Sequence, residues 1–141
     1  MGNTWRKNCS YYRRRRQSSG IGLATAKKFV SEGAHISITD KQNKKLDTAV
    51  SEIGKNIEGI EDDVSNLADL DNLYRTAKDH KGHIDILFAN AGIIRFIPLK
   101  EITKEHFYNL FDVNVKGALF SVQKALPIFR DGGYIFKCFK R

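Results

Sequence analysis

The sequence is poor in the residues that stabilise small disulfide-rich or metal-binding domains. Its two cysteines, Cys9 and Cys138, lie near opposite ends of the chain and show no spacing typical of a metal or redox site. No apolar run reaches the roughly 18 residues that cross a membrane, and no repeat or low-complexity linker interrupts the chain. We therefore expect one cytoplasmic domain with no bound metal and no membrane partner.

The net charge of +8 is unevenly distributed along the 141 residues. Residues 1–16 hold six basic and no acidic side chains, and residues 130–141 hold four basic and one acidic. The segment between them is nearly neutral. A folded nucleic-acid-binding domain carries its basic patch on its folded surface, so we do not expect a nucleic-acid partner. The alternative is a non-specific nucleic-acid contact through Arg13, Arg14, Arg15 and Arg16.

Hydrophobic periodicity predicts a regular alternation of helices and strands from residue 20 onward. Apolar residues recur at helical spacing in four segments, at 20–33, 41–53, 66–81 and 103–126. Four shorter segments have the composition and pattern of strands, at 34–39, 56–61, 84–89 and 133–136. This order, with its short loops, predicts an α/β fold: a three-layer, Rossmann-type parallel sheet with helices on both faces.

The helix expected at 103–126 is the longest in the chain. Thr103 can cap its amino end, and Pro127 marks its carboxyl end. Its expected inner side comprises Phe107, Leu110, Phe111, Asn114, Val115, Ala118, Leu119, Val122 and Ala125.

The strand that should precede the first helix is degenerate in sequence. Residues 8–14 are polar and charged, and burial of such groups costs several kcal/mol each, roughly, unless they are paired. We therefore do not expect a regular strand there. We divide the chain into a basic leader at 1–17, a Rossmann-type domain at 18–136 and a basic tail at 137–141.

Gly20, Ile21 and Gly22 stand where the chain enters the first expected helix. Glycines there let the backbone approach a pyrophosphate, and the helix N-terminus supplies oriented N–H groups. Asp40 ends the next expected strand, where a carboxylate can accept hydrogen bonds from both ribose hydroxyls of NAD. Lys41 follows it and can instead favour a 2′-phosphate, so NAD and NADP both stay open. A plain helix start and a solvated turn aspartate are the alternative interpretations.

Two further strand ends carry acidic or small residues. Asp63 and Val64 follow the third expected strand, where a side-chain acceptor and a flat apolar contact could hold an adenine edge. Asn90, Ala91 and Gly92 follow the fourth, where small residues let the backbone approach a ligand. An acidic loop and an ordinary turn are the alternatives for each segment alone. In a parallel sheet all these strand ends meet at one edge, so their combination predicts a nucleotide site.

These segments together resemble the short-chain dehydrogenase/reductase family over roughly residues 18–133. The resemblance rests on Ser-Gly-Ile-Gly at 19–22, Asp-Val at 63–64, Phe-Ala-Asn-Ala-Gly at 88–92 and Phe-Asp-Val-Asn-Val-Lys-Gly at 111–117. It implies hydride transfer between a nicotinamide and an alcohol or carbonyl carbon of a small-molecule substrate, with NAD or NADP as cofactor. It also implies that residues 18–136 are a partial NAD(P)-binding Rossmann domain, with an incomplete sheet because the C-terminal half is missing.

The resemblance also implies a role for each candidate residue. Gly20, Ile21 and Gly22 would line the pyrophosphate, and the remaining cofactor contacts would come from Asp40, Lys41, Asp63, Val64, Asn90, Ala91 and Gly92. Asn114 would be the helix-kink asparagine of the family's proton relay, the one remaining catalytic residue. Members of the family usually form homo-oligomers through helices, including the one expected at 103–126.

The family's catalytic Tyr-x-x-x-Lys has no counterpart downstream of Asn114, and no serine follows Ser121. Tyr74 and Lys78 have this spacing but precede the Asn-Ala-Gly segment, so we expect a core-facing tyrosine and a solvated lysine. General acid–base catalysis contributes about 10²–10⁴-fold, so we expect this chain to be inactive. The alternatives are a nucleotide-binding module without catalysis and complementation by a second chain that carries the missing residues.

Both ends depart from the family pattern, and one cause could explain both departures. Codons for residues 8–14, read one base later, can encode Ile-Ala-Val-Ile-Thr-Gly-Gly, which resembles the family's first strand and turn. Codons for residues 136–141 can similarly encode Leu-Asn-Ala-Ser-Asn, which resembles the strand with the catalytic serine. We hypothesise that both ends are translated out of frame.

Overall fold

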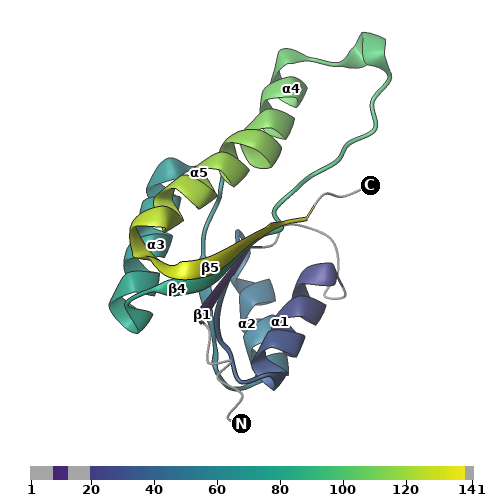
Figure 1. The fold of residues 1–141 in the computed structure, drawn as a ribbon. Helices are drawn as coiled ribbons and strands as arrows, with labels where there is room; N and C mark the ends of the chain where they lie inside the picture. Colours follow the sequence, from purple (N-terminus) through teal and green to yellow (C-terminus); the bar gives the residue numbers. More distant parts are fainter. Residues whose placement is uncertain (1–7, 13–19, 139–141) are drawn as a thin grey trace.

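Five parallel strands form the sheet of the computed structural model, which describes residues 8–12 and 20–138 (Figure 1). Their order across the sheet is β3-β2-β1-β4-β5, so the first strand lies in the centre. The strands are β1 (Asn8–Tyr12), β2 (His35–Asp40), β3 (Ile57–Glu61), β4 (Ile84–Ala89) and β5 (Phe129–Lys137). The four strands predicted after residue 33 are therefore confirmed, with β5 starting four residues earlier than predicted.

Helices cover both faces of this sheet, which gives the predicted three layers (Figure 1). They are α1 (Ile21–Ser31), α2 (Asn43–Ile53), α3 (Leu67–Lys81), α4 (Lys104–Phe111) and α5 (Gly117–Ala125). Figure 1 shows α1 and α2 on one face, with α3 and α5 on the other. A π-helical turn, Asp112–Lys116, joins α4 to α5, so the long helix predicted at 103–126 is continuous but locally underwound. Within the described residues, no helix has the length and apolar character needed to cross a membrane.

Each face of the sheet has its own hydrophobic core. Between the sheet and α1 and α2, the buried cluster comprises Ala26, Ala34, Ile36, Ile38 and Leu46. Between the sheet and α3 and α5, it comprises Val64, Leu70, Leu73, Tyr74, Ile84, Leu87, Val113 and Ala125. Burial on both faces explains why β4 is largely apolar in sequence rather than alternating.

Residues 8–12 form a strand, which corrects the expectation from composition that this segment forms none. In β1, Ser10 lies opposite Ser37 of β2 and Leu87 of β4. Pairing on both sides satisfies the backbone N–H and C=O groups of all three strands, and tyrosine favours extended backbone. Backbone pairing therefore decides the conformation of this segment, although its side chains depart from the family pattern. Residues 13–19 lie outside the described residues.

The long helix buries only part of the side that was predicted, because Ala125 is buried and Val122 packs against the core as expected, whereas the bulky residues before them do not. Phe107, Phe111, Val115 and Leu119 were expected inside but are 46–61% exposed. Three buried positions that were not predicted, Val113, Gly117 and Ser121, form one i, i+4 row with Ala125. Gly117 explains this choice, because a Cβ there would lie 2.7 Å from Cγ2 of Val64. The small-residue row allows close packing, so the bulky row faces outward.

Candidate functional site

The carboxyl ends of the parallel strands bring the predicted site residues to one edge of the sheet. Asp40 ends β2, Asp63 follows β3 and Asn90 follows β4. β2 and β3 pair in parallel, with Asp40 opposite Glu61, so their ends are adjacent, and the end of β4 lies at the same edge beyond β1. The topology therefore gathers the residues that the sequence placed in separate loops.

The start of α1 has no side-chain cap from its N-cap residue. Gly20 is the N-cap, with extended backbone (φ −90°, ψ 167°), and its carbonyl accepts a hydrogen bond from Ala24 N at 3.3 Å. No acidic residue lies in the first turn. Gly22 is buried, whereas Ile21 is 62% exposed. Amides at such a helix start can bind an anion, since glycine leaves them uncovered and no carboxylate repels the ligand.

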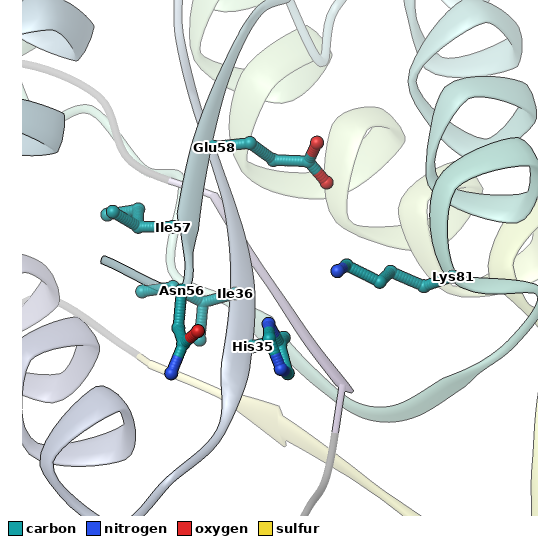
Figure 2. A pocket seen from close by; sticks show the side chains of 6 residues that line it. All are labelled: His35, Ile36, Asn56, Ile57, Glu58 and Lys81. Carbon is teal, nitrogen blue, oxygen red and sulfur yellow. The ribbon is translucent and has the colours of Figure 1, made fainter. Parts of the chain in front are cut away.

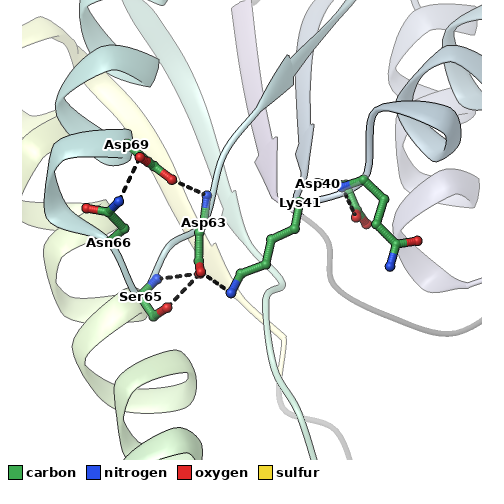
Figure 3. Close-up of polar contacts among 7 residues, drawn as sticks. Asp40, Lys41, Asp63, Ser65, Asn66 and Asp69 are labelled. Atoms are coloured by element: carbon green, nitrogen blue, oxygen red, sulfur yellow. Dashed lines mark hydrogen bonds and ion pairs between the residues drawn. The ribbon is translucent and has the colours of Figure 1, made fainter.

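Asp40 and Lys41 have different surroundings although they are adjacent in sequence (Figure 3). The Asp40 side chain is buried, and its Oδ1 accepts a hydrogen bond from the backbone N–H of Gln42 at 3.0 Å. Lys41 reaches across to Asp63 and forms an ion pair with its carboxylate. Both partners of this pair are partly buried, so it is less screened by solvent than an exposed pair. The pair joins the ends of β2 and β3.

The Asp63 carboxylate accepts hydrogen bonds from Ser65 and pairs with Lys41 (Figure 3). Its Oδ1 accepts from Ser65 N at 3.0 Å and from Ser65 Oγ at 2.7 Å. Burial opposes its ionisation, but the hydrogen bonds from Lys41 and Ser65 and the Lys41 charge outweigh burial, so the pKa of Asp63 lies below its usual value. Asp63 is therefore an anion over the whole physiological pH range.

Val64 turns away from Asp63 and into the core. Its side chain is 1% exposed and packs against the position of Gly117. The side chain that was expected to contact an adenine edge is therefore inside the core and not on the surface of this edge.

Asn114 connects the π-helical turn to the loop after β4. Its Oδ1 accepts from Ile93 N at 2.8 Å, and its Nδ2 donates to Ile93 O at 2.9 Å. Gly92 lies directly beside this contact, since a Cβ there would lie 3.2 Å from Asn114 Oδ1. Asn90 is 5% exposed, and Ala91 packs against the core. The asparagine therefore fixes the path of the segment that the sequence analysis placed beside a cofactor.

Sequence reasoning missed two residues near this edge. Asp62 is 1% exposed, and neither of its carboxylate oxygens has a hydrogen-bond partner among the described residues. Burial, followed by the charges of Asp69 and Asp63, raises the pKa of Asp62 to about 7, against the opposing charge of Lys41. Lys137 at the end of β5 donates from Nζ to Asn114 O at 3.2 Å. Two consecutive aspartates after a strand were the available signal for Asp62, because adjacent side chains point in different directions.

Tyr74 and Lys78 lie where the sequence analysis expected them. Tyr74 is 5% exposed in the core between α3 and α5, and Lys78 is exposed. Burial, followed by the charge of Asp62, raises the pKa of Tyr74 well above its usual value, and a hydrogen bond with Ser121 opposes this shift. This tyrosine is therefore a neutral core residue away from the candidate site. No cluster of three His, Cys, Asp or Glu side chains within residues 8–12 and 20–138 is arranged to hold a metal.

The sheet order and the helix layers define a doubly wound, Rossmann-type α/β class of protein, a class in which ligands bind at the carboxyl ends of the strands. Residues 17–136 match the sequence profile of the family described as short chain dehydrogenase. The chain belongs to the short-chain dehydrogenase family.

Curated relatives agree with this membership. The chain is 41% identical over 116 residues to Oxidoreductase asL5 of Sarocladium schorii, a match that covers 82% of the chain and 47% of the relative. It is 36% identical over 104 residues to Galactitol 2-dehydrogenase of Agrobacterium fabrum, covering 74% and 41%. The chain thus spans about half the length of these relatives.

Solved structures share the fold. A short-chain dehydrogenase/reductase of the glucose/ribitol dehydrogenase type from Brucella melitensis superposes with a TM-score of 0.86 at 26% identity, covering 93% of this chain and 55% of that one. A 3-ketoacyl-(acyl-carrier-protein) reductase from the same organism, complexed with NADH, superposes with a TM-score of 0.83 at 28% identity. The match covers 93% of this chain and 55% of that one.

Proposed function

We propose that this chain is the cofactor-binding half of an NAD(P)-dependent short-chain dehydrogenase/reductase that acts on an alcohol or carbonyl group. The observation that carries the proposal is the gathering of Asp40, Asp63 and Asn90 at the carboxyl edge of one parallel sheet. Dinucleotides bind at this edge in doubly wound sheets. The family membership supports the reaction type.

The groups at this edge suit a dinucleotide chemically. The uncapped first turn of α1, entered through Gly20, Ile21 and Gly22, has amides and no acidic side chain to meet a pyrophosphate. Asp40 and Asp63 are acceptors suited to ribose hydroxyls and to the adenine amino group. A bound cofactor would supply the hydride donor or acceptor.

The loop after β4 would lie along the cofactor. Asn90, Ala91 and Gly92 are small or buried, so the backbone can come close to a ligand. Asn114 holds this loop through both hydrogen bonds to Ile93. Its proposed contribution is therefore to position the loop.

Within this proposal NAD fits the edge better than NADP. A carboxylate at the end of β2 attracts ribose hydroxyls and repels a 2′-phosphate. Lys41, the residue that could favour the phosphate, is ion-paired with Asp63, so its charge is already compensated. The NADH complex of the 28% identical reductase agrees with this preference.

Calorimetric titration with NADH and NADPH tests the proposal. We expect NADH to bind more tightly than NADPH. Asp40→Ser should reduce the ratio of the NADPH to the NADH dissociation constant by about tenfold, which corresponds to about 1.4 kcal/mol. Asp47→Ser on the exposed side of α2 is the matched control and should leave the ratio unchanged. Absence of binding by both nucleotides would refute the site, and tighter binding of NADPH would refute the preference.

We also propose that the 141-residue polypeptide binds its cofactor without turning it over. The single Tyr-x-x-x-Lys spacing in the sequence begins at Tyr74, which lies in the core rather than at the edge. A spectrophotometric assay with NAD and galactitol, chosen after the named relative, should show no NADH production above the blank. Production that depends on enzyme concentration would contradict the proposal.

The exposed row of the long helix suits self-association. Phe107 and Phe111 stack with their ring centroids 4.2 Å apart, and Val115 and Leu119 continue the same row at 51% and 61% exposure. We propose that two copies bury this row against each other. Sedimentation velocity should find a dimer that Leu119→Glu dissociates and that Gln123→Glu, an exposed control on α5, leaves intact. A monomeric unmodified chain would contradict this assignment.

A further inference from the structure

A second hollow lies at the opposite edge of the sheet from the candidate dinucleotide site. This pocket of about 290 Å³ is lined by His35, Ile36, Asn56, Ile57, Glu58 and Lys81 (Figure 2). His35 and Ile57 begin β2 and β3, whereas Asp40 and Glu61 end them. A strand of six residues is about 20 Å long, so the two regions are well separated.

Glu58, the acidic residue of the pocket, already has polar partners for both of its carboxylate oxygens. Glu58 Oε1 accepts a hydrogen bond from Ser37 Oγ at 2.5 Å, and Glu58 Oε2 lies 2.6 Å from Nδ1 of His80. Strand alternation places His35, Ser37 and Glu58 on the face that α3 covers. The carboxylate is thus engaged from two sides by the protein itself.

The basic groups of the pocket have no such partner. Figure 2 shows the Lys81 side chain extending from the end of α3 into the space beside Glu58. Neither the Lys81 ammonium nor the His35 ring has a hydrogen bond or an ion pair among the described residues. The Asn56 amide adds a donor from a residue in the left-handed backbone region (φ 56°).

We propose that this pocket binds a small oxyanion, a phosphate or a carboxylate group, between Lys81, His35 and Asn56. The donors come from three separate segments, and both oxygens of the one carboxylate among them already contact Ser37 and His80. A charged donor on an anion gives a stronger hydrogen bond than a neutral one. The pocket is independent of the cofactor edge, so a ligand there would be an effector rather than a substrate.

The helix end supplies a matched control for this assignment. Lys78 and Lys81 both lie in the last turn of α3, where cations stabilise the negative end of the helix dipole. Lys81 lines the pocket and Lys78 does not. A role in capping the helix therefore predicts similar effects for both lysines, whereas a ligand site predicts an effect at Lys81 alone.

Nuclear magnetic resonance titration of the full chain with inorganic phosphate and with acetate, at constant ionic strength set by chloride, tests the proposal. We expect saturable shifts of the His35 ring and of the Asn56 and Ile57 amides. Lys81→Met and His35→Gln should each weaken binding by about tenfold, the loss expected for one charge-assisted hydrogen bond. Lys78→Met should leave the affinity unchanged.

Comparison of the two anions shows whether the pocket binds a phosphate group or a carboxylate group. Saturable binding of phosphate alone assigns a phosphate-bearing ligand, and saturable binding of acetate alone assigns a carboxylate. Absence of saturable shifts with both anions would overturn the site. Equal weakening by Lys78→Met and Lys81→Met would also overturn it, because the effect would then reflect general surface charge.

Discussion

The buried carboxyl of Asp62 should make the stability of this fold fall as pH rises. Burial and the neighbouring charges of Asp69 and Asp63 raise the pKa of Asp62 from 3.8 to about 7. Between these values the folded chain keeps a proton that the unfolded chain releases. The stabilisation is therefore complete below pH 3.8 and is lost as pH rises through about 7.

The size of this effect follows from the width of the pH window. Each pH unit between 3.8 and about 7 lowers the free energy of unfolding by about 1.4 kcal/mol. The total loss across this window is roughly 4 kcal/mol. That is a large part of the total stability of about 5–15 kcal/mol that is typical of a domain. Asp63 acts in the opposite direction, because its pKa is lowered in the folded chain. Its contribution is lost as pH falls below 3.8, so the two windows do not overlap.

Urea unfolding followed by circular dichroism, from about pH 4 to about pH 8, measures this dependence. The free energy of unfolding of the unmodified chain should fall relative to that of Asp62→Asn, which cannot titrate, by roughly 4 kcal/mol across the window. Asp79→Asn, an exposed control on α3, should follow the unmodified chain. Asp62→Ala provides a second non-titrating variant if the asparagine variant does not fold.

The reasoning is refuted if the difference in stability between the unmodified chain and both Asp62 variants stays constant with pH. That result would mean that the carboxyl is ionised and compensated in the folded state. A difference that grows with rising pH in favour of the unmodified chain would refute the sign.

Three other predictions concern the helix packing, the loop contact and the coding sequence. Gly117→Ala places a Cβ 2.7 Å from Val64 Cγ2 and should lower the free energy of unfolding by about 1–3 kcal/mol. Ala118→Ser, at the adjacent half-buried position, should lower it by less. Equal losses of unfolding free energy for the two variants, measured by calorimetry, would contradict the close packing. Asn114→Ala removes both hydrogen bonds to Ile93 and should lower the free energy of unfolding by about 1–3 kcal/mol. Asn114→Asp should have an intermediate effect because it keeps the acceptor. An unchanged rate of amide hydrogen exchange at Ile93 would contradict the role of Asn114 in holding the loop. Sequencing the coding DNA of residues 8–14 and 136–141 should reveal family-like residues in the frame one base later, and their absence in both segments would reject the frameshift hypothesis.

Local pattern was sufficient to predict most of the fold. The helices from α1 to α3 and the strands from β2 to β4 begin and end within two residues of their predicted positions, because apolar periodicity and glycine stops act locally. β1 was not predicted, because composition argued against burial of residues 8–14. Its pairing partners, β2 and β4, come from segments far along the chain. A central strand is therefore decided by neighbours that no local window contains.

The site was predictable in position but not in contacts. Strand order brings Asp40, Asp63 and Asn90 to one edge, as the pattern of strand ends predicted. That Lys41 pairs with Asp63 was not predictable, since it requires the spacing between β2 and β3. The buried row of the long helix was likewise hidden, because both rows have helical spacing and only packing of Gly117 on Val64 distinguishes them.

The sequence by itself determined the alternation of strands and helices and the family to which the chain belongs, because both depend on residue types at fixed spacing. Only the tertiary structure decided what adjacent residues do. Asp62 and Asp63 are the same residue type in neighbouring positions, yet one is buried without a hydrogen-bond partner among the described residues and the other pairs with Lys41 at the edge. The reason is geometric: consecutive side chains point to different sides of the chain, and the surroundings on each side are built from distant segments.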